Sequence, residues 1–142
     1  MSKIEPQTNF AFEIARSRFT DAYSSLDKAI NERLLGMKAK VRSNHAANVK
    51  SLMKAEPGPH LSKTAKANID ETLAELSTIQ SIRNSITHGQ MTALKFENLD
   101  QAVFVNAFQP SQRATNAIML SQSQFDHLIK TLEKIEKTIR KS

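Results

Sequence analysis

The chain has 142 residues, of which 39% are apolar, with only three glycines, four prolines and a formal net charge of +6. This composition is typical of one mostly helical globular domain and unlike that of a disordered chain. The absence of cysteine excludes a disulfide framework, a thiolate zinc site and a cysteine nucleophile.

The sequence predicts neither secretion nor a membrane span. Its first residues lack the apolar core of a signal peptide, and no run of about 18 apolar residues is available to cross a bilayer. We therefore expect a cytoplasmic protein with no membrane partner.

The first predicted element is a long amphipathic helix from about Gln7 to Leu35, in which apolar residues recur at steps of three and four. Gly36 is expected to end or bend this helix. A second helical stretch is then expected to run to Ala55. The sequence Pro57-Gly58-Pro59 cannot continue a helix, so a turn separates these elements from the rest of the chain.

The positive charge is concentrated in one segment of this region. Residues 37–66 hold seven basic side chains and one acidic one, whereas basic and acidic residues balance in the rest of the chain. Such a block is either a solvated face or a surface for a polyanion. Because no aromatic residue is interleaved in it, contacts to phosphates are expected rather than base stacking. The candidate contact residues are Lys38, Lys40, Arg42, Lys50 and Lys54.

The third predicted helix follows Ser62, which can cap it, and its apolar residues form one buried stripe. The members of this stripe are Ile69, Leu73, Leu76, Ile79, Ile82 and Ile86.

Beyond Gly89 the apolar period changes from about 3.6 towards 2, which favours strands. Residues 102–108 and 116–120 are predicted strands with a turn at 110–113, and residues 94–97 are a candidate third strand. Ser121 or Ser123 can cap a final helix, with Gln124 or Asp126 completing a capping box. The expected fold is mainly α: an up-and-down helical bundle with a small β-hairpin inserted before the last helix, in one domain over residues 1–142.

The end of the third helix carries the sequence Arg83-Asn84-Ser85-Ile86-Thr87-His88-Gly89. Asn84 and His88 lie four residues apart and share a helical face, and Arg83 is one step round with a side chain long enough to reach them. Gly89 is expected just past the helix end, where the backbone turns left-handed. Arg83 and His88 should lie at the edge of the buried stripe, where they can meet solvent, a partner chain or a substrate.

The same residues also form an ordinary helix stop signal, so a structural and a functional interpretation both stay open. Other chemistry is excluded by the residue inventory. The four histidines lack metal-ligand spacing, and the chain has neither a phosphate-binding glycine loop nor a Gly-x-Ser-x-Gly elbow. We therefore expect no metal and no cofactor.

The helical frame and the string Arg83-Asn84-x-x-x-His88 resemble the HEPN superfamily (higher eukaryotes and prokaryotes nucleotide-binding domain), whose members carry an Arg-x4-6-His motif, frequently with Asn after the Arg. The motif match covers residues 83–88 and Gly89, and the predicted helices are compatible with the family's bundle over nearly the whole chain. Many members are metal-independent endoribonucleases in toxin–antitoxin, abortive-infection or RNA-processing systems, and others have lost activity. The resemblance implies that Arg83 and His88 are catalytic, that Asn84 supports them, and that two protomers face each other across one cleft.

RNA supplies its own nucleophile, the 2′-hydroxyl, so such an enzyme need only move protons and stabilise the extra charge on the phosphorane. His88 would move the proton and Arg83 would hold the phosphate oxygens, giving a 2′,3′-cyclic phosphate and a 5′-hydroxyl. A homodimer would supply a second histidine. The resemblance therefore implies an RNA-cleaving toxin or defence effector with a cognate antitoxin as a further partner. The alternative is a non-catalytic helical module that binds a nucleotide, an RNA or a protein.

Overall fold

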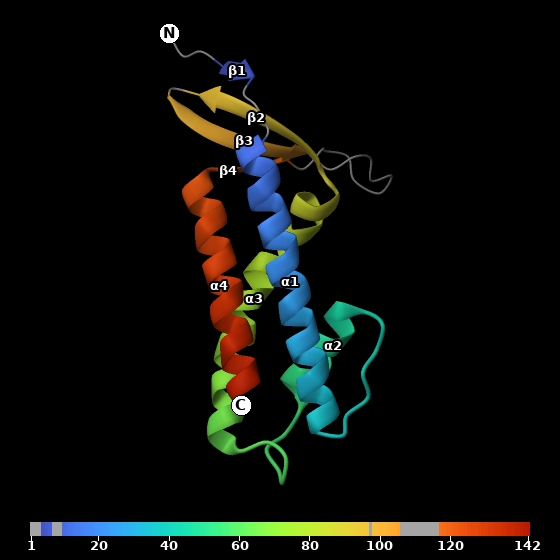
Figure 1. The fold of residues 1–142 in the computed structure, drawn as a ribbon. Coiled ribbons are helices and arrows are strands. Elements are labelled where there is room, and N and C mark those ends of the chain that lie inside the picture. Colours follow the sequence, from blue (N-terminus) through green and yellow to red (C-terminus); the bar gives the residue numbers. More distant parts are fainter. Residues whose placement is uncertain (1–3, 7–9, 97, 106–116) are drawn as a thin grey trace. The chain divides into compact units, whose positions relative to one another are not determined.

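The computed structural model describes residues 4–6, 10–96, 98–105 and 117–142. These residues form four helices and four strands (Figure 1). In chain order the elements are β1 (Ile4–Pro6), α1 (Phe10–Gly36), α2 (His45–Lys54), α3 (Lys63–His88), β2 (Gln90–Phe96), β3 (Leu99–Val105), β4 (Ala117–Leu120) and α4 (Gln122–Lys141). The predicted fold class is confirmed: the chain is mainly helical, with antiparallel strands inserted before the last helix.

The chain divides into two compact units. Unit 1 comprises Met1–Thr20 and Ile79–Ile129, and unit 2 comprises Asp21–Thr78 and Lys130–Ser142. Helices α1, α3 and α4 therefore contribute residues to both units. The expectation of a single domain over residues 1–142 stays a prediction.

Unit 1 contains an antiparallel sheet with the strand order β1-β2-β3-β4. One row of its register joins Ala93 to Ala102 and Ala102 to Leu120, and all three residues are buried. These small or apolar side chains form one covered face, because alternate residues of a strand point to the same side of the sheet. The predicted pairing of residues 102–105 with 117–120 is confirmed, whereas residues 106–116, including the predicted turn, lie outside the described residues.

Three strands differ from the sequence prediction. The strand expected over residues 102–108 begins earlier, because β3 starts at Leu99. Residues 94–96 of the candidate strand at 94–97 are part of a longer strand. This strand, β2, begins at Gln90, with only Gly89 between it and α3, and pairs with β3 over its full length. Strand β1 was not predicted, and its residues Ile4–Pro6 pair with β2. Three residues are too few to show an apolar period, and Pro6 is tolerated because β1 is an edge strand.

Three aromatic rings pack the helices of unit 1 against the sheet. Phe104 of β3 meets Phe125 of α4 edge-on at 5.8 Å between ring centroids, and Phe12 of α1 lies 6.3 Å from Phe125. Phe104 and Phe125 are fully buried. Their position in the core confirms the apolar periodicity of the sequence and leaves these rings no role in base stacking.

Unit 2 is helical, and aliphatic side chains from α1, α2, α3 and α4 form its core. The fully buried members include Leu26, Ile30 and Leu34 of α1, Leu52 of α2, Leu73 and Leu76 of α3, and Leu132 and Ile139 of α4. Ile82 of α3, which falls in unit 1, was predicted to be buried and is only half-buried. Within the described residues, no helix combines the length and the apolar character needed to span a bilayer.

The connection between α1 and α2 confirms one prediction and corrects another. Helix α1 ends at Gly36, as expected, and the chain then turns left-handed at Lys38, with φ 58°. The amides of Lys38 and Ala39 donate to Leu35 and Leu34, as in a Schellman motif. The second helix was expected to follow at once, yet it begins only at His45, because Asn44 caps it by accepting from the Ala47 amide.

The starts of α3 and α4 have the caps that the sequence predicted. The Ser62 hydroxyl accepts from the Ala65 amide at the start of α3. At α4 the capping box is formed by Ser121 and Gln124: the Gln124 amide donates to the Ser121 hydroxyl, and the Ser121 amide donates to the Gln124 side chain at 2.8 Å. The alternatives Ser123 and Asp126 are thereby resolved in favour of Ser121 and Gln124.

Candidate active site

The motif residues occupy the last two turns of α3, in unit 1. The helix ends at His88, and Gly89 is the next residue, as predicted. Asn84 and His88 are exposed and Arg83 is half-buried, which agrees with the expected position at the edge of the buried stripe. The side chains of Asn84 and His88 make no hydrogen bond to another described residue, so both polar groups are open to solvent.

Gly89 is required at this point for a reason other than the one predicted. No described glycine has a positive φ, so the expected left-handed turn at Gly89 is wrong. Instead, a Cβ on Gly89 would lie 2.2 Å from the carbonyl oxygen of Ser85, far inside van der Waals contact. The Gly89 amide donates to that same carbonyl at 2.8 Å. The missing side chain thus lets the chain close the last turn tightly and enter β2 at once.

Arg16 of α1 holds the carboxyl end of α3. Its Nε donates to the carbonyl of Ile86 at 2.6 Å, and its second terminal nitrogen donates to Thr87 at 3.0 Å and Gly89 at 2.8 Å. These carbonyls belong to the last turn or follow it, where a helix leaves acceptors unpaired and its dipole is negative. A half-buried guanidinium therefore stabilises the backbone on both sides of His88.

The same guanidinium also packs on the sheet, 5.7 Å from the centroid of the Phe104 ring. Arg16 thus ties the carboxyl end of α3 to α1 and to β3 within unit 1. The role of Arg16 could not be predicted from the sequence, because Arg16 lies 70 residues before its first acceptor. The one available signal was a basic residue between the buried positions Ala15 and Phe19 of α1.

The basic segment divides into exposed and buried members, all in unit 2. Lys38, Lys40, Arg42, Lys50 and Lys54 are exposed, and none has an ion pair with another described residue. Lys66, in contrast, is buried: its Nζ donates to the carbonyls of Leu52 and Met53 at 3.0 and 2.6 Å and pairs with Asp70 at 2.7 Å. One cation of the segment therefore caps α2, and the five predicted contact residues remain available to an anion.

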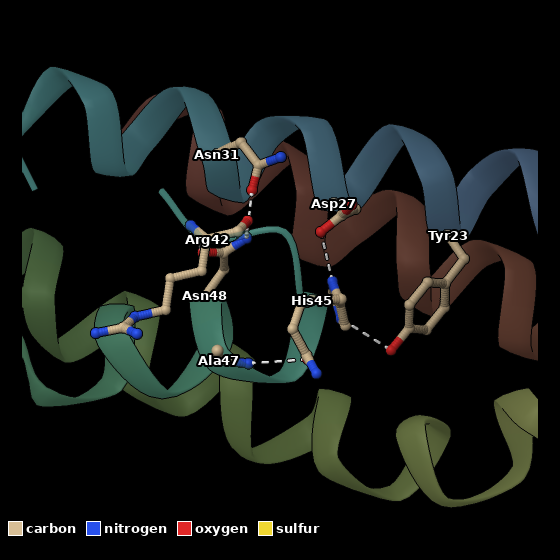
Figure 2. Close-up of polar contacts among 8 residues, drawn as sticks. Tyr23, Asp27, Asn31, Arg42, His45, Ala47 and Asn48 are labelled. Atoms are coloured by element: carbon tan, nitrogen blue, oxygen red, sulfur yellow. Dashed lines mark hydrogen bonds and ion pairs between the residues drawn. The ribbon is translucent and has the colours of Figure 1, made fainter. Parts of the chain in front are cut away.

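A second polar cluster joins α1 to α2 within unit 2 (Figure 2). The His45 ring bonds to Asp27 at 2.6 Å and to the Tyr23 hydroxyl at 3.0 Å. Asn48, only 1% exposed, donates to Asn31 at 3.0 Å. The sequence signal for this contact was the spacing of Tyr23, Asp27 and Asn31, which repeats every four residues beside the buried stripe.

A cavity of about 500 Å³ lies in unit 2, between the first half of α3 and the last half of α4. Hydroxyls and charges of both signs line it, including Thr72, Glu75 and Lys134, and Glu75 and Lys134 pair at 3.7 Å. None of the motif residues lines this cavity. We therefore base the candidate site on the exposed end of α3.

An ion-pair cluster on α1 and α4 of unit 2 shifts the pKa of the Glu136 carboxyl. Arg140 bonds to Glu136 at 2.8 Å and to Glu32 at 2.6 Å. Burial raises the pKa of Glu136. Hydrogen bonds from Ser25 and Arg140 and the charge of Arg140 together lower it by more, so the pKa lies below its ordinary value. This cluster stabilises the helices and holds no residue of the candidate site.

No protein-family model, curated protein or solved structure matches this chain. The resemblance to the HEPN superfamily therefore stays a prediction that depends on the motif and on the helical fold.

Proposed function

We propose that the protein is a metal-independent endoribonuclease of the HEPN type. The observation that carries the proposal is the placement of the half-buried Arg83 and the exposed Asn84 and His88 on a helix end whose backbone Arg16 and Gly89 hold in place. Catalytic groups need such a rigid support, because small displacements of a reacting group greatly reduce the rate.

Each residue has a distinct chemical role in the proposed reaction. The 2′-hydroxyl of the RNA attacks the adjacent phosphorus, and the bond to the 5′-oxygen of the next nucleotide breaks. His88 takes or delivers the proton, Arg83 holds the phosphate oxygens through its planar fork, and Asn84 orients the imidazole or the phosphate. The products are a 2′,3′-cyclic phosphate and a 5′-hydroxyl.

The proposal includes a homodimer, because paired acid–base work needs two proton-transfer groups and one motif supplies one histidine. The protein would act in the cytoplasm as a toxin or defence effector restrained by a cognate antitoxin. Sedimentation of only a monomer at micromolar concentration would contradict the composite site.

The experiment is cleavage of a labelled single-stranded RNA in the presence of EDTA, with analysis of the product termini. The wild-type protein is expected to cut, and His88→Ala and Arg83→Ala to lose most of the activity. His60→Ala and Arg18→Ala are matched controls, because both side chains are exposed and lie outside the motif. Their activity should equal that of the wild type.

A second candidate function, non-catalytic binding, is supported by the structural roles of Arg16 and Gly89 at the end of α3. Arg16 already satisfies the last carbonyls of α3, and Gly89 accounts for the tight turn, so the fold needs no catalysis to explain this sequence. In that case the chain is a non-catalytic helical module that binds a nucleotide, an RNA or a protein. Uncut RNA after incubation with a wild-type protein that still binds it would favour this candidate.

A further inference from the structure

The loop between α1 and α2, residues 37–44, presents three exposed cations. Lys38, Lys40 and Arg42 have no ion pair with a described residue. Two carboxylates of α1 in the same unit are already engaged, Asp27 with His45 and Glu32 with Arg140, each at 2.6 Å. The loop therefore has a positive charge that the contacts on these two carboxylates do not neutralise.

Lys38 occupies a position that normally favours glycine. Its φ of 58° is left-handed, and its amide and that of Ala39 donate to Leu35 at 3.0 Å and Leu34 at 2.9 Å to close α1. A side chain at this C′ position is strained, because its Cβ crowds the backbone. Glycine would relieve the strain but remove the charge, so the residue present is the one that puts an ammonium group at the start of the loop.

Asn48 fixes the other end of the loop. Its side-chain oxygen accepts from the Arg42 amide at 2.7 Å, and its side-chain nitrogen donates to the Arg42 carbonyl at 2.9 Å. The same nitrogen donates to Asn31 of α1 at 3.0 Å, and the Asn48 side chain is buried. Figure 2 shows Asn48 placed between Asn31 and the Arg42 backbone, while the Arg42 guanidinium extends away from both.

We propose that loop 37–44 is a preformed binding site for the phosphate backbone of RNA, in which Lys38, Lys40 and Arg42 contact phosphates and Asn48 is the positioning residue. The choice of RNA among polyanions rests on the proposed function. A loop held in one shape loses less conformational entropy on binding, so its cations contribute more affinity than the same charges on a flexible segment. The absence of aromatic residues from this loop fits contacts to phosphate rather than to bases.

The first test measures binding of a 2′-O-methylated RNA oligomer by fluorescence anisotropy over a range of salt concentrations. This RNA lacks the nucleophile, so a failure of cleavage cannot change the result. Replacing Lys38, Lys40 and Arg42 together with Gln should make the slope of log affinity against log salt concentration less steep by about two. Each contact with a single strand contributes about 0.7 to that slope. The matched control replaces Lys63, Lys130 and Lys137, which are equally exposed, and should leave the slope near the wild-type value. Equal losses in both triple variants would overturn the proposal.

The second test separates loop shape from charge. Asn48→Ala keeps every cation but releases Arg42, so affinity should fall severalfold. Asn31→Ala removes one partner of Asn48 and leaves its two bonds to Arg42, so affinity should stay close to the wild type. Equal affinity for wild type and Asn48→Ala would contradict a preformed site.

A third pair of variants keeps the proposal testable if Asn48→Ala fails to fold. Lys38→Gly and Lys38→Gln remove the same charge, but only the glycine relieves the left-handed strain. Both should bind the oligomer more weakly, and Lys38→Gly alone should melt at a higher temperature than the wild type. If Lys38→Gly binds as tightly as the wild type, Lys38 makes no contact and the proposal is wrong.

Discussion

Gly89 is the residue whose substitution the structure constrains most directly. In Gly89→Ala the new Cβ would meet the Ser85 carbonyl oxygen at 2.2 Å, and that oxygen is fixed by its place in the helix. We expect a loss of about 1–3 kcal/mol in the free energy of unfolding, the usual cost of overpacking. Urea denaturation measures this loss.

Gly36→Ala is the control for that measurement, because its Cβ would find only an ordinary contact at 3.7 Å with the Arg33 side chain. Its stability should be unchanged or slightly raised, since alanine favours a helix. A Gly89→Ala protein as stable as the Gly36→Ala protein would contradict the close approach.

The lowered pKa of Glu136 should make the free energy of unfolding depend on pH. Its pKa in the folded protein is below its ordinary value of 4.5, so the unfolded chain binds the proton more tightly. Its contribution is therefore fully present above that ordinary value and is lost as the pH falls through the folded pKa. Glu136→Gln should flatten the loss of stability between about pH 5 and pH 3. Glu133→Gln, an exposed neighbour on α4, should keep the wild-type slope, and an unchanged slope in Glu136→Gln would contradict this assignment.

At the scale of the elements, Arg16 is the contact that joins α1 to the end of α3 in unit 1. Arg16→Met would leave three carbonyls without their donor and remove the contact with Phe104. Because such half-buried acceptors each cost about 1–3 kcal/mol when unpaired and some regain water, we expect a total loss of about 2–4 kcal/mol.

Native-state hydrogen exchange and urea denaturation test this prediction. Amides in the last turns of α3 should exchange faster in Arg16→Met than in the wild type. Arg18→Met is the control on the same helix, because the one ion pair of Arg18 with a described residue is an exposed contact with Asp126 at 3.9 Å, which is worth little. Similar stability of the two variants would show that Arg16 does not hold the helix end.

Local signals predicted the elements, and distant contacts explain the errors. Ser62 and the pair Ser121 and Gln124 are correct caps, because capping depends on residues within one turn. The strand β1 and the Arg16 contact were missed, because each partner lies about 70 or more positions away. Gly36 is the last residue of α1, as expected, but the left-handed turn after it falls on Lys38, where no glycine marks it.

The candidate site divides in the same way. The sequence predicted that Arg83 and His88 lie at the edge of the buried stripe near a helix end, because the helical period fixes the face and Gly89 marks the terminus. It did not predict what holds that end, since Arg16 lies 70 positions before its first acceptor and Gly89 was expected to be left-handed rather than close to the Ser85 carbonyl. The catalytic roles of the three residues stay a prediction.

At the scale of the whole molecule, the chain has two features that an RNA-cleaving protein requires. Unit 1 carries the candidate catalytic residues, and unit 2 carries the exposed cations that can contact phosphates. The net charge of +6 comes from the basic segment, while the rest of the sequence is balanced. We therefore expect long-range attraction to RNA to depend on unit 2 and the chemical step to depend on unit 1.

The most direct test of this account is the cleavage rate of labelled RNA by His88→Ala compared with the wild type, in EDTA, with thermal stability measured on the same samples. We expect the rate to fall by about three orders of magnitude or more, since removing one member of a cooperating catalytic set loses most of its effect. Stability should change by less than about 1 kcal/mol, because the His88 side chain is exposed. Wild-type and His88→Ala proteins that cut at equal rates, or a wild type that never cuts RNA, would contradict the account.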